Sequence, residues 1–216
     1  GCIDILACNY DSTKIYADGS CIYPEMGFDC DGYVIAEIGD EFQGGILFYV
    51  DETGKHGMVT AKKNYHLSWG LSYIGSWGCP IFVEEATDIS IGAGYSNTNA
   101  IANSSNENNC STESGEVLNA AEFCLNFEYD GFSDWHLPSL NELITMYNVL
   151  PTSDFDIPNN NHYYWSSNQH TGIEYWQGFA PTSMYNYAWG VHMISGEIAI
   201  LSKGSYNYII RPVRYF

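Results

Sequence analysis

Aromatic and amide side chains gather between residues 168 and 208, and their types suit recognition of a ligand. Tyr and Trp give broad, stiff contact surfaces that also stack on sugar faces, and Asn gives adaptable hydrogen bonds. These residues stand in or beside turns, where strand ends and loops hold side chains near solvent. The predicted ligand-binding residues are Asn168, His170, Tyr175, Trp176, Tyr185, Asn186, Tyr187, Tyr206, Asn207 and Tyr208.

The segment NYAWGVHMI in this region has a second interpretation. Alternation along a strand places Tyr187 and Trp189 on one face, which could instead belong to the core. Trp189 is therefore left out of the predicted site. The loop from Trp69 to Trp77 is the alternative location for it.

A second group of side chains near the N-terminus offers hard oxygen ligands. Asp4, Asn9, Asp11 and Asp18 lie in a short, cysteine-rich stretch, and oxygen donors in a tight loop suit Ca²⁺. Their spacing differs from the EF-hand pattern, and Asx turns that cap the loop are the alternative. The sequence thus suggests calcium as a cofactor, and no organic cofactor is expected.

No pattern in the sequence assembles a catalytic centre. The histidines occur without an HExxH pair, a nucleophile elbow or a glycine-rich loop that opens a helix. The neighbouring Glu84 and Glu85 have nothing apolar around them to raise a pKa, so they are expected to be solvated. We therefore expect a protein that is not an enzyme. The histidines are His56, His66, His136, His162, His170 and His192.

The seven cysteines predict an oxidising compartment. Four of them, Cys2, Cys8, Cys21 and Cys30, crowd a segment with too little apolar sequence for a core, as in a disulfide-held module. Their pairing is open, and a zinc knuckle is disfavoured because no CxxC pair or nearby His is present. The remaining cysteines are expected to form one bond, Cys110 with Cys124, and to leave Cys79 as a buried free thiol or an intermolecular link.

Composition excludes several classes of partner. The 216 residues are 45% hydrophobic and 16% aromatic, which favours a folded chain over a disordered one. Acidic residues outnumber basic ones by 26 to 7, and the net charge of −19 would repel nucleic acids and anionic membranes. No apolar run approaches the roughly 20 residues of a membrane span, and the N-terminus lacks a signal-peptide pattern. We expect a soluble chain, or one processed before Gly1.

The order of predicted elements indicates an α+β fold. Two apolar runs between residues 38 and 61 surround a polar turn and predict a β-hairpin. Residues 62–109 lack a sustained period and are expected to form a long, irregular, ligand-accessible loop. Beyond residue 161 the chain again has strand patterns, with Ser195 and Gly196 turning one hairpin.

Two helices are expected between the loop and the strands. The first spans Glu116 to Phe127, and its inward face is Val117, Ala121, Cys124 and Leu125. The second begins after Ser139, whose spacing to Glu142 forms a capping box, and ends before Pro151. Its apolar stripe is Leu140, Leu143, Ile144 and Tyr147.

Several aromatic and basic residues are expected to support the fold rather than contact a ligand. Trp135, Leu137 and Leu140 should lock a helix onto a sheet, and Trp165 should be structural as well. Arg211 and Arg214 should each find a carboxylate, with Asp134 and Glu142 as candidates.

A series of motifs resembles the Lcl C-terminal-like domain family. They are QGGILFYVDETGKHGMV, AAEFC, GFSDWHLPSLNEL, YYWSS, an AW strand, a turn at Lys203 and the ending IIRPVRYF, in that order. The resemblance implies a fold like that of C-type lectins and of the formylglycine-generating-enzyme group. The best-known member of the Lcl C-terminal-like family is an adhesin domain that binds sulfated glycosaminoglycans. The resemblance therefore implies an extracellular binding module. His136 replaces the Arg of the relatives' DWRLP motif and, with the acidic charge, argues against a sulfated ligand.

The front segment GCIDILACNYDSTKIYADGSCIYP resembles a cysteine-rich repeat of secreted bacterial surface proteins. Such repeats usually occur in tandem, which implies part of a longer surface structure. Within it, Asp11-Ser12-Thr13 resembles a bacterial O-glycosylation signal, so Ser12 is the candidate glycosylation site.

These features predict two domains and one function. Residues 1–37 should form a disulfide-braced module, and residues 38–216 an α+β, C-type-lectin-like domain with two helices and antiparallel strands. We expect a secreted or surface-held bacterial module that binds a glycan or a surface protein without catalysis. The alternative is a structural subunit of an extracellular fibre that pairs with copies of itself. Neither nucleic acid nor membrane insertion is expected.

Overall fold

The computed structural model describes residues 1–65, 76–107, 119–155, 163–172, 186–205 and 208–216. Helices and antiparallel strands are combined, which confirms the predicted α+β class. There are three α-helices among these residues where the sequence predicts two. The elements are β1 (Glu41–Phe42), β2 (Gly45–Val50), β3 (Gly57–Thr60), the 3₁₀ turn η1 (Glu84–Ala86), α1 (Gly94–Glu107), α2 (Ala120–Leu125), α3 (Leu140–Val149), the 3₁₀ turn η2 (Thr152–Asp154), β4 (Tyr163–Gln169), β5 (Tyr187–His192), β6 (Ile198–Ser202) and β7 (Val213–Tyr215).

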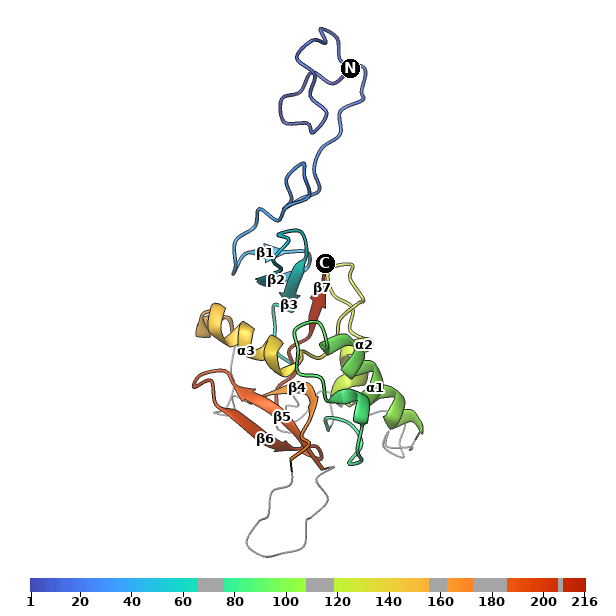
Figure 1. Ribbon diagram of the computed structural model, residues 1–216, viewed down its shortest axis with the longest axis vertical. Helices are drawn as coiled ribbons and strands as arrows, with labels where there is room; N and C mark the ends of the chain where they lie inside the picture. Colours follow the sequence, from blue (N-terminus) through green and yellow to red (C-terminus); the bar gives the residue numbers. More distant parts are fainter. Residues whose placement is uncertain (66–75, 108–118, 156–162, 173–185, 206–207) are drawn as a thin grey trace, which may run out of the picture.

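The strands form two antiparallel sheets, in the orders β1-β2-β3-β7 and β4-β5-β6. The predicted hairpin is confirmed, because β2 pairs with β3 with Leu47 opposite Val59. The hairpin between β5 and β6 is confirmed as well, and it contains Gly196 at φ +74°, a conformation that suits glycine. Helix α3 lies between the two sheets, while α1 and α2 pack together beside the second sheet (Figure 1).

Helix α3 follows the local signals of the sequence. Ser139 is its N-cap, and Ser139 and Glu142 form the predicted capping box. The helix ends at Val149, before Pro151, and it buries Leu143 and Met146 in the core.

Helix α2 begins later than predicted. Asn119 has extended backbone angles and forms a second capping box with Glu122, so the helix starts at Ala120 rather than at Glu116. Ala121 and Cys124 face the core as expected.

Helix α1 lies within the stretch predicted to be an irregular loop, so that prediction is wrong for residues 94–107. Its sequence, GYSNTNAIANSSNE, is rich in residues of low helix propensity and has little apolar periodicity. Buried polar contacts hold it in place: Asn97 donates to the Asp88 carbonyl at 2.7 Å, and Thr98 accepts from the Leu137 N–H at 3.0 Å. Tertiary partners therefore decide this helix.

The residues expected to support the fold largely do so. Trp135, Leu137 and Trp165 have no exposed surface. Arg214 pairs with Asp134 through two hydrogen bonds of 2.6 and 3.1 Å, as predicted. Arg211 differs from this expectation: within the described part of the chain it donates to neutral side chains, Thr60 at 3.0 Å and Asn64 at 2.8 Å, rather than to a carboxylate.

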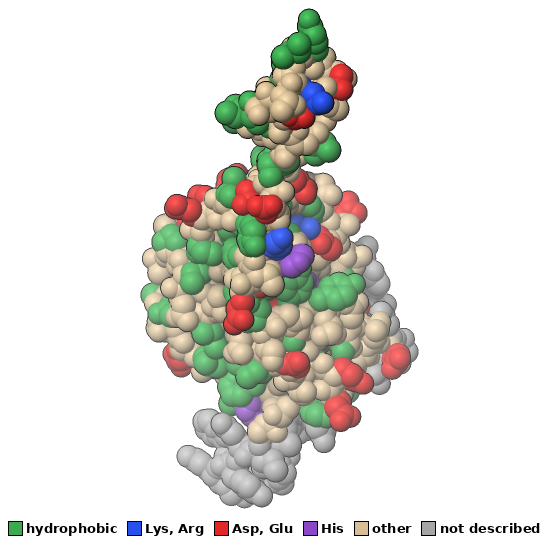
Figure 2. Space-filling model, turned by 45° about the horizontal axis from the view of Figure 1, so that its top comes forward, with side chains coloured by type: hydrophobic (Ala, Val, Ile, Leu, Met, Phe, Trp, Pro, Cys, Tyr) green, Lys and Arg blue, Asp and Glu red, His purple; other side chains and the backbone are tan. Residues whose placement is uncertain are grey.

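Residues 1–37, which we call the N-terminal arm, stand out from the body of the molecule (Figures 1 and 2). They contain no helix or extended strand. The disulfides Cys2–Cys21 and Cys8–Cys30 brace this segment, which confirms the predicted crosslinks and decides their pairing. Crosslinks thus replace an apolar core in the arm.

The predicted bond between Cys110 and Cys124 is wrong. Cys124 is a free, fully buried thiol on the inner face of α2, where it packs as a small apolar group. Burial raises the pKa of this thiol well above its usual value. Cys79, expected to be free or linked to another molecule, is disulfide-bonded, and Cys110 lies outside the described residues. None of the described helices combines the length and apolarity that crossing a bilayer requires.

Candidate functional site

An open groove with a volume of about 850 Å³ runs along α1, and we call it the α1 groove. One bank is a face of α1, and the other is the segment 81–85, which runs into η1. Aromatic, amide and hydroxyl side chains line it, with a carboxylate on each bank. The lining residues are Ile81, Phe82, Val83, Glu85, Tyr95, Ser96, Asn99, Ala100, Asn103, Ser104 and Glu107.

The spacing of residues on α1 explains the shape of this bank. Tyr95, Asn99, Asn103 and Glu107 are four residues apart and form one ridge along the helix. At a rise of 1.5 Å per residue, this ridge extends about 18 Å. The neighbouring row, which begins at Ser96, has only small side chains and leaves the groove open beside the ridge.

The opposite bank is held by a buried lysine. Lys203, which follows β6, has no exposed surface, and its Nζ donates to the Ile81 carbonyl at 2.8 Å and to Gln169 Oε1 at 2.7 Å. The same Gln169 oxygen accepts the Val83 N–H at 2.8 Å. Lys203 Nζ also lies 4.2 Å from the ring centroid of Trp77. Burial lowers the pKa of Lys203 to about 7.

The start of α1 is held by a buried carboxylate. Glu142 Oε1 accepts the Gly92 N–H at 2.8 Å and the Tyr215 hydroxyl at 2.6 Å, while Oε2 accepts the Ser139 N–H at 2.7 Å. Burial raises the pKa of Glu142, and these hydrogen bonds oppose that shift. A Cβ at Gly94 would lie 2.5 Å from Glu142 Oε2, so glycine is required for this close approach. The carboxylate therefore joins α3, β7 and the N-terminus of α1.

His136 lies beneath Tyr95, the aromatic residue at the start of the ridge. Its ring stacks on Tyr215 at 5.0 Å and meets Tyr95 edge-on at 5.8 Å. Both ring nitrogens are buried without a hydrogen-bond partner among the described residues. Burial lowers the pKa of His136 to about 4, so the imidazole is neutral at pH 7.

The predicted ligand-binding residues do not form one exposed surface. Asn168 is fully buried, and its side chain joins the Leu140 N–H to the Asp88 carbonyl at 2.7 Å each. His170 is buried against Trp189. The expectation that Asn168 and His170 lie near solvent is therefore wrong.

Of the other predicted residues, Asn186 is partly buried, Tyr187 is exposed, and Tyr208 packs edge-on against Trp165. Tyr175, Trp176, Tyr185, Tyr206 and Asn207 lie outside the described residues, as does the alternative loop except for its last two residues, 76 and 77.

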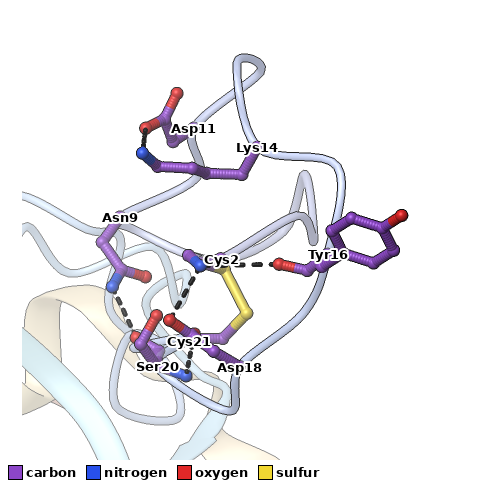
Figure 3. Close-up of polar contacts among 9 residues, drawn as sticks. Cys2, Asn9, Asp11, Lys14, Tyr16, Asp18, Ser20 and Cys21 are labelled. Carbon is purple, nitrogen blue, oxygen red and sulfur yellow. Dashed lines mark hydrogen bonds and ion pairs between the residues drawn. A yellow bond between two sulfur atoms is a disulfide. The ribbon is translucent and has the colours of Figure 1, made fainter.

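The predicted calcium ligands are engaged in hydrogen bonds and ion pairs within the N-terminal arm, and Figure 3 shows Asn9, Asp11 and Asp18. Asp18 accepts the Ser20 N–H and pairs with the N-terminal amine at 2.8 Å, and Asn9 accepts the Ile22 N–H. Asp4 and Asp11 accept N–H groups two residues ahead in the same way. Across the described ranges, no three His, Cys, Asp or Glu side chains converge as a metal site would require. Calcium binding stays a prediction, as does glycosylation of the exposed Ser12.

A comparison with known families matches a part of the chain that includes every residue lining the groove. The family model of the Lcl C-terminal domain matches residues 81–214. The chain belongs to this family. The match spans η1 through the start of β7, whereas β1 to β3 and the N-terminal arm lie outside it. No curated protein matches the chain. The α1 groove therefore lies entirely within the Lcl C-terminal domain of this chain.

The sequence does not indicate the α1 groove, because it predicts an irregular loop where the structure has helix α1. The four-residue spacing from Tyr95 to Glu107 was the one available signal, since it places amides and an aromatic ring on one helical ridge.

Proposed function

We propose that this chain is an extracellular, non-enzymatic adhesion module that recognises carbohydrate through the α1 groove. The observation that supports this proposal is that exposed aromatic rings and amide side chains line the same open groove. Phe82 is 44% and Tyr95 51% exposed; Tyr95 shares the α1 ridge with Asn99 and Asn103, and Phe82 lines the same groove. Rings stack on the apolar faces of sugars, and amides exchange hydrogen bonds with hydroxyl groups.

The wider setting supports a secreted or surface-held protein of a bacterium. Disulfides form and persist outside the reducing cytosol, and the family membership is consistent with secretion. We extend the proposal to a C-type-lectin-like fold for the body and to a surface-protein repeat for the N-terminal arm. The order of hairpin, helices and second antiparallel sheet supports the first, and the paired cysteines support the second.

A glycan array tests the proposal directly. Wild type, Tyr95→Ala and Asn103→Ala are compared at equal concentration, with the exposed arm variant Tyr16→Ala as the matched control. Loss of one stacking ring should weaken binding about tenfold. Asn103 is exposed, so its variant separates a lost contact from lost folding. Unchanged glycan binding by both groove variants, with unchanged melting temperatures, would refute carbohydrate recognition at this groove.

The apolar surface of the N-terminal arm favours a second function, a structural subunit of an extracellular fibre. Five apolar side chains of the arm are each more than 70% exposed, and Figure 2 shows apolar groups over its surface. In this alternative the arm docks onto another copy of the chain. Sedimentation of wild type against a double Ile15→Asp, Tyr16→Asp variant tests it, because a fibre subunit should assemble only with the intact arm. The five residues are Ile5, Leu6, Ile15, Tyr16 and Met26.

A further inference from the structure

The charges around the α1 groove specify its ligand further, if carbohydrate recognition at this groove holds. All seven Lys and Arg residues of the chain lie within the described ranges, and none lines the groove. Two carboxylates do line it, Glu85 on one bank and Glu107 on the other. The groove is therefore acidic.

The basic residues are also unsuited to an anionic ligand elsewhere. Arg214 is paired with Asp134, Lys62 with Glu41, and Lys203 is buried within the protein. Recognition of sulfate or carboxylate groups needs exposed guanidinium or ammonium donors that converge on one site. The remaining lysines are the exposed Lys14 on the arm, the partly buried Lys55 beside the ring of Tyr33, and the exposed Lys63.

The two groove carboxylates are available to a ligand. Glu85 and Glu107 are exposed, and neither forms an ion pair with a Lys or Arg of this chain. Glu107 is also the last residue of α1, where the helix dipole adds partial negative charge. Two carboxylates without counterions, on facing banks, complement a ligand that carries positive charge.

We infer that the α1 groove selects amino sugars with free amines over their acetylated and sulfated counterparts. The sugar faces stack on Phe82 and Tyr95, and the ammonium groups pair with Glu85 and Glu107. An exposed ion pair contributes about threefold in affinity, so two pairs favour the amine form by about tenfold. The preference should shrink as salt is raised, since exposed pairs are screened.

Calorimetry with three tetrasaccharides tests this inference. The probes are an N-acetylglucosamine tetramer, the de-N-acetylated glucosamine tetramer and a heparin tetrasaccharide. Wild type is compared with Glu85→Gln and Glu107→Gln, and Glu128→Gln serves as the control, because Glu128 is exposed outside the groove. Each groove variant should lower the preference for the amine form about threefold, and the control should leave it unchanged.

The outcomes separate the inference from the proposed function. Equal binding of the acetylated and amine forms, still weakened by Tyr95→Ala, would leave carbohydrate recognition standing and refute amine selection. An equal loss in Glu128→Gln would show attraction by the overall negative charge and would also refute it. Preference for heparin would overturn it outright. Failure of all three probes to bind, together with a glycan array indifferent to Tyr95→Ala, would remove both proposals.

Discussion

Replacement of Glu142 by Gln should destabilise the domain, because every group that reaches this carboxylate is a hydrogen-bond donor. Oε2 accepts the Ser139 N–H, while Oε1 accepts the Gly92 N–H and the Tyr215 hydroxyl. Gln keeps the shape of the side chain but turns one of these oxygens into an NH₂ group. Whichever way the amide is oriented, the NH₂ group then faces a backbone N–H.

Two opposing effects set the size of the loss. A buried donor without its acceptor costs about 1 to 3 kcal/mol, and the surviving bonds weaken when the acceptor loses its charge. The neutral amide avoids the desolvation that raises the pKa of Glu142, which offsets part of this cost. We therefore expect a net loss of about 2 kcal/mol, which for a chain of this size lowers the melting temperature by about 4 to 8 °C.

Thermal and urea unfolding at pH 7 measure this effect. The control is Glu128→Gln, which removes the same charge from an exposed position and should melt as wild type does. Tyr215→Phe removes one donor from the carboxylate and leaves the backbone contacts of Ser139, Gly92 and Gly94, so it should cost less, about 1 kcal/mol. If Glu142→Gln melts within 1 °C of the control, the donor-only network around the carboxylate is not what stabilises this region.

Three further predictions concern other buried groups. Because burial lowers the pKa of His136 to about 4, the folded state resists protonation, and stability should fall as the pH drops from about 6.5 toward 4. In His136→Phe, the free energy of unfolding should decrease by about 3 kcal/mol less over this pH range than in wild type. Urea unfolding at several pH values measures this, and an unchanged pH dependence would contradict the prediction. After unfolding without reductant, Cys124 should react with iodoacetamide and Cys79 should not; recovery of alkylated Cys79 would argue against its disulfide. Arg214→Lys should cost about 1 kcal/mol, since Lys cannot make both bonds to the half-exposed Asp134, and a double-mutant cycle with Asp134→Asn that shows no coupling would oppose this.

Features that depend on a few neighbouring residues could be predicted from the sequence. The capping box of Ser139 and Glu142 fixed the start of α3, and the β2–β3 hairpin followed from two apolar runs around a polar turn. The disulfide bracing of the N-terminal arm followed from the density of cysteines, although the pairing did not. In each case the partners lie within about twenty residues, so their spacing carries the information.

Features that depend on distant partners were decided by the tertiary structure. The sequence predicts a ligand-facing amide at Asn168, yet this side chain is buried because Leu140 and Asp88 supply its hydrogen bonds from other parts of the fold. The sequence likewise could not reveal which cysteine is free, because that depends on which face of α2 meets the core.

Helix α1 best illustrates the difference between what the sequence determines and what only the tertiary structure decides. By itself the sequence determined the acidic charge, the α+β class and the local caps and turns, since these need only composition and short-range spacing. The residues of α1 favour loops when taken alone, and their apolar pattern is too sparse to indicate a helix. The helix exists because its polar inner face finds partners such as the Asp88 carbonyl and the Leu137 N–H. The groove along its outer face therefore arises only in the folded chain, where buried hydrogen bonds compensate for low helix propensity.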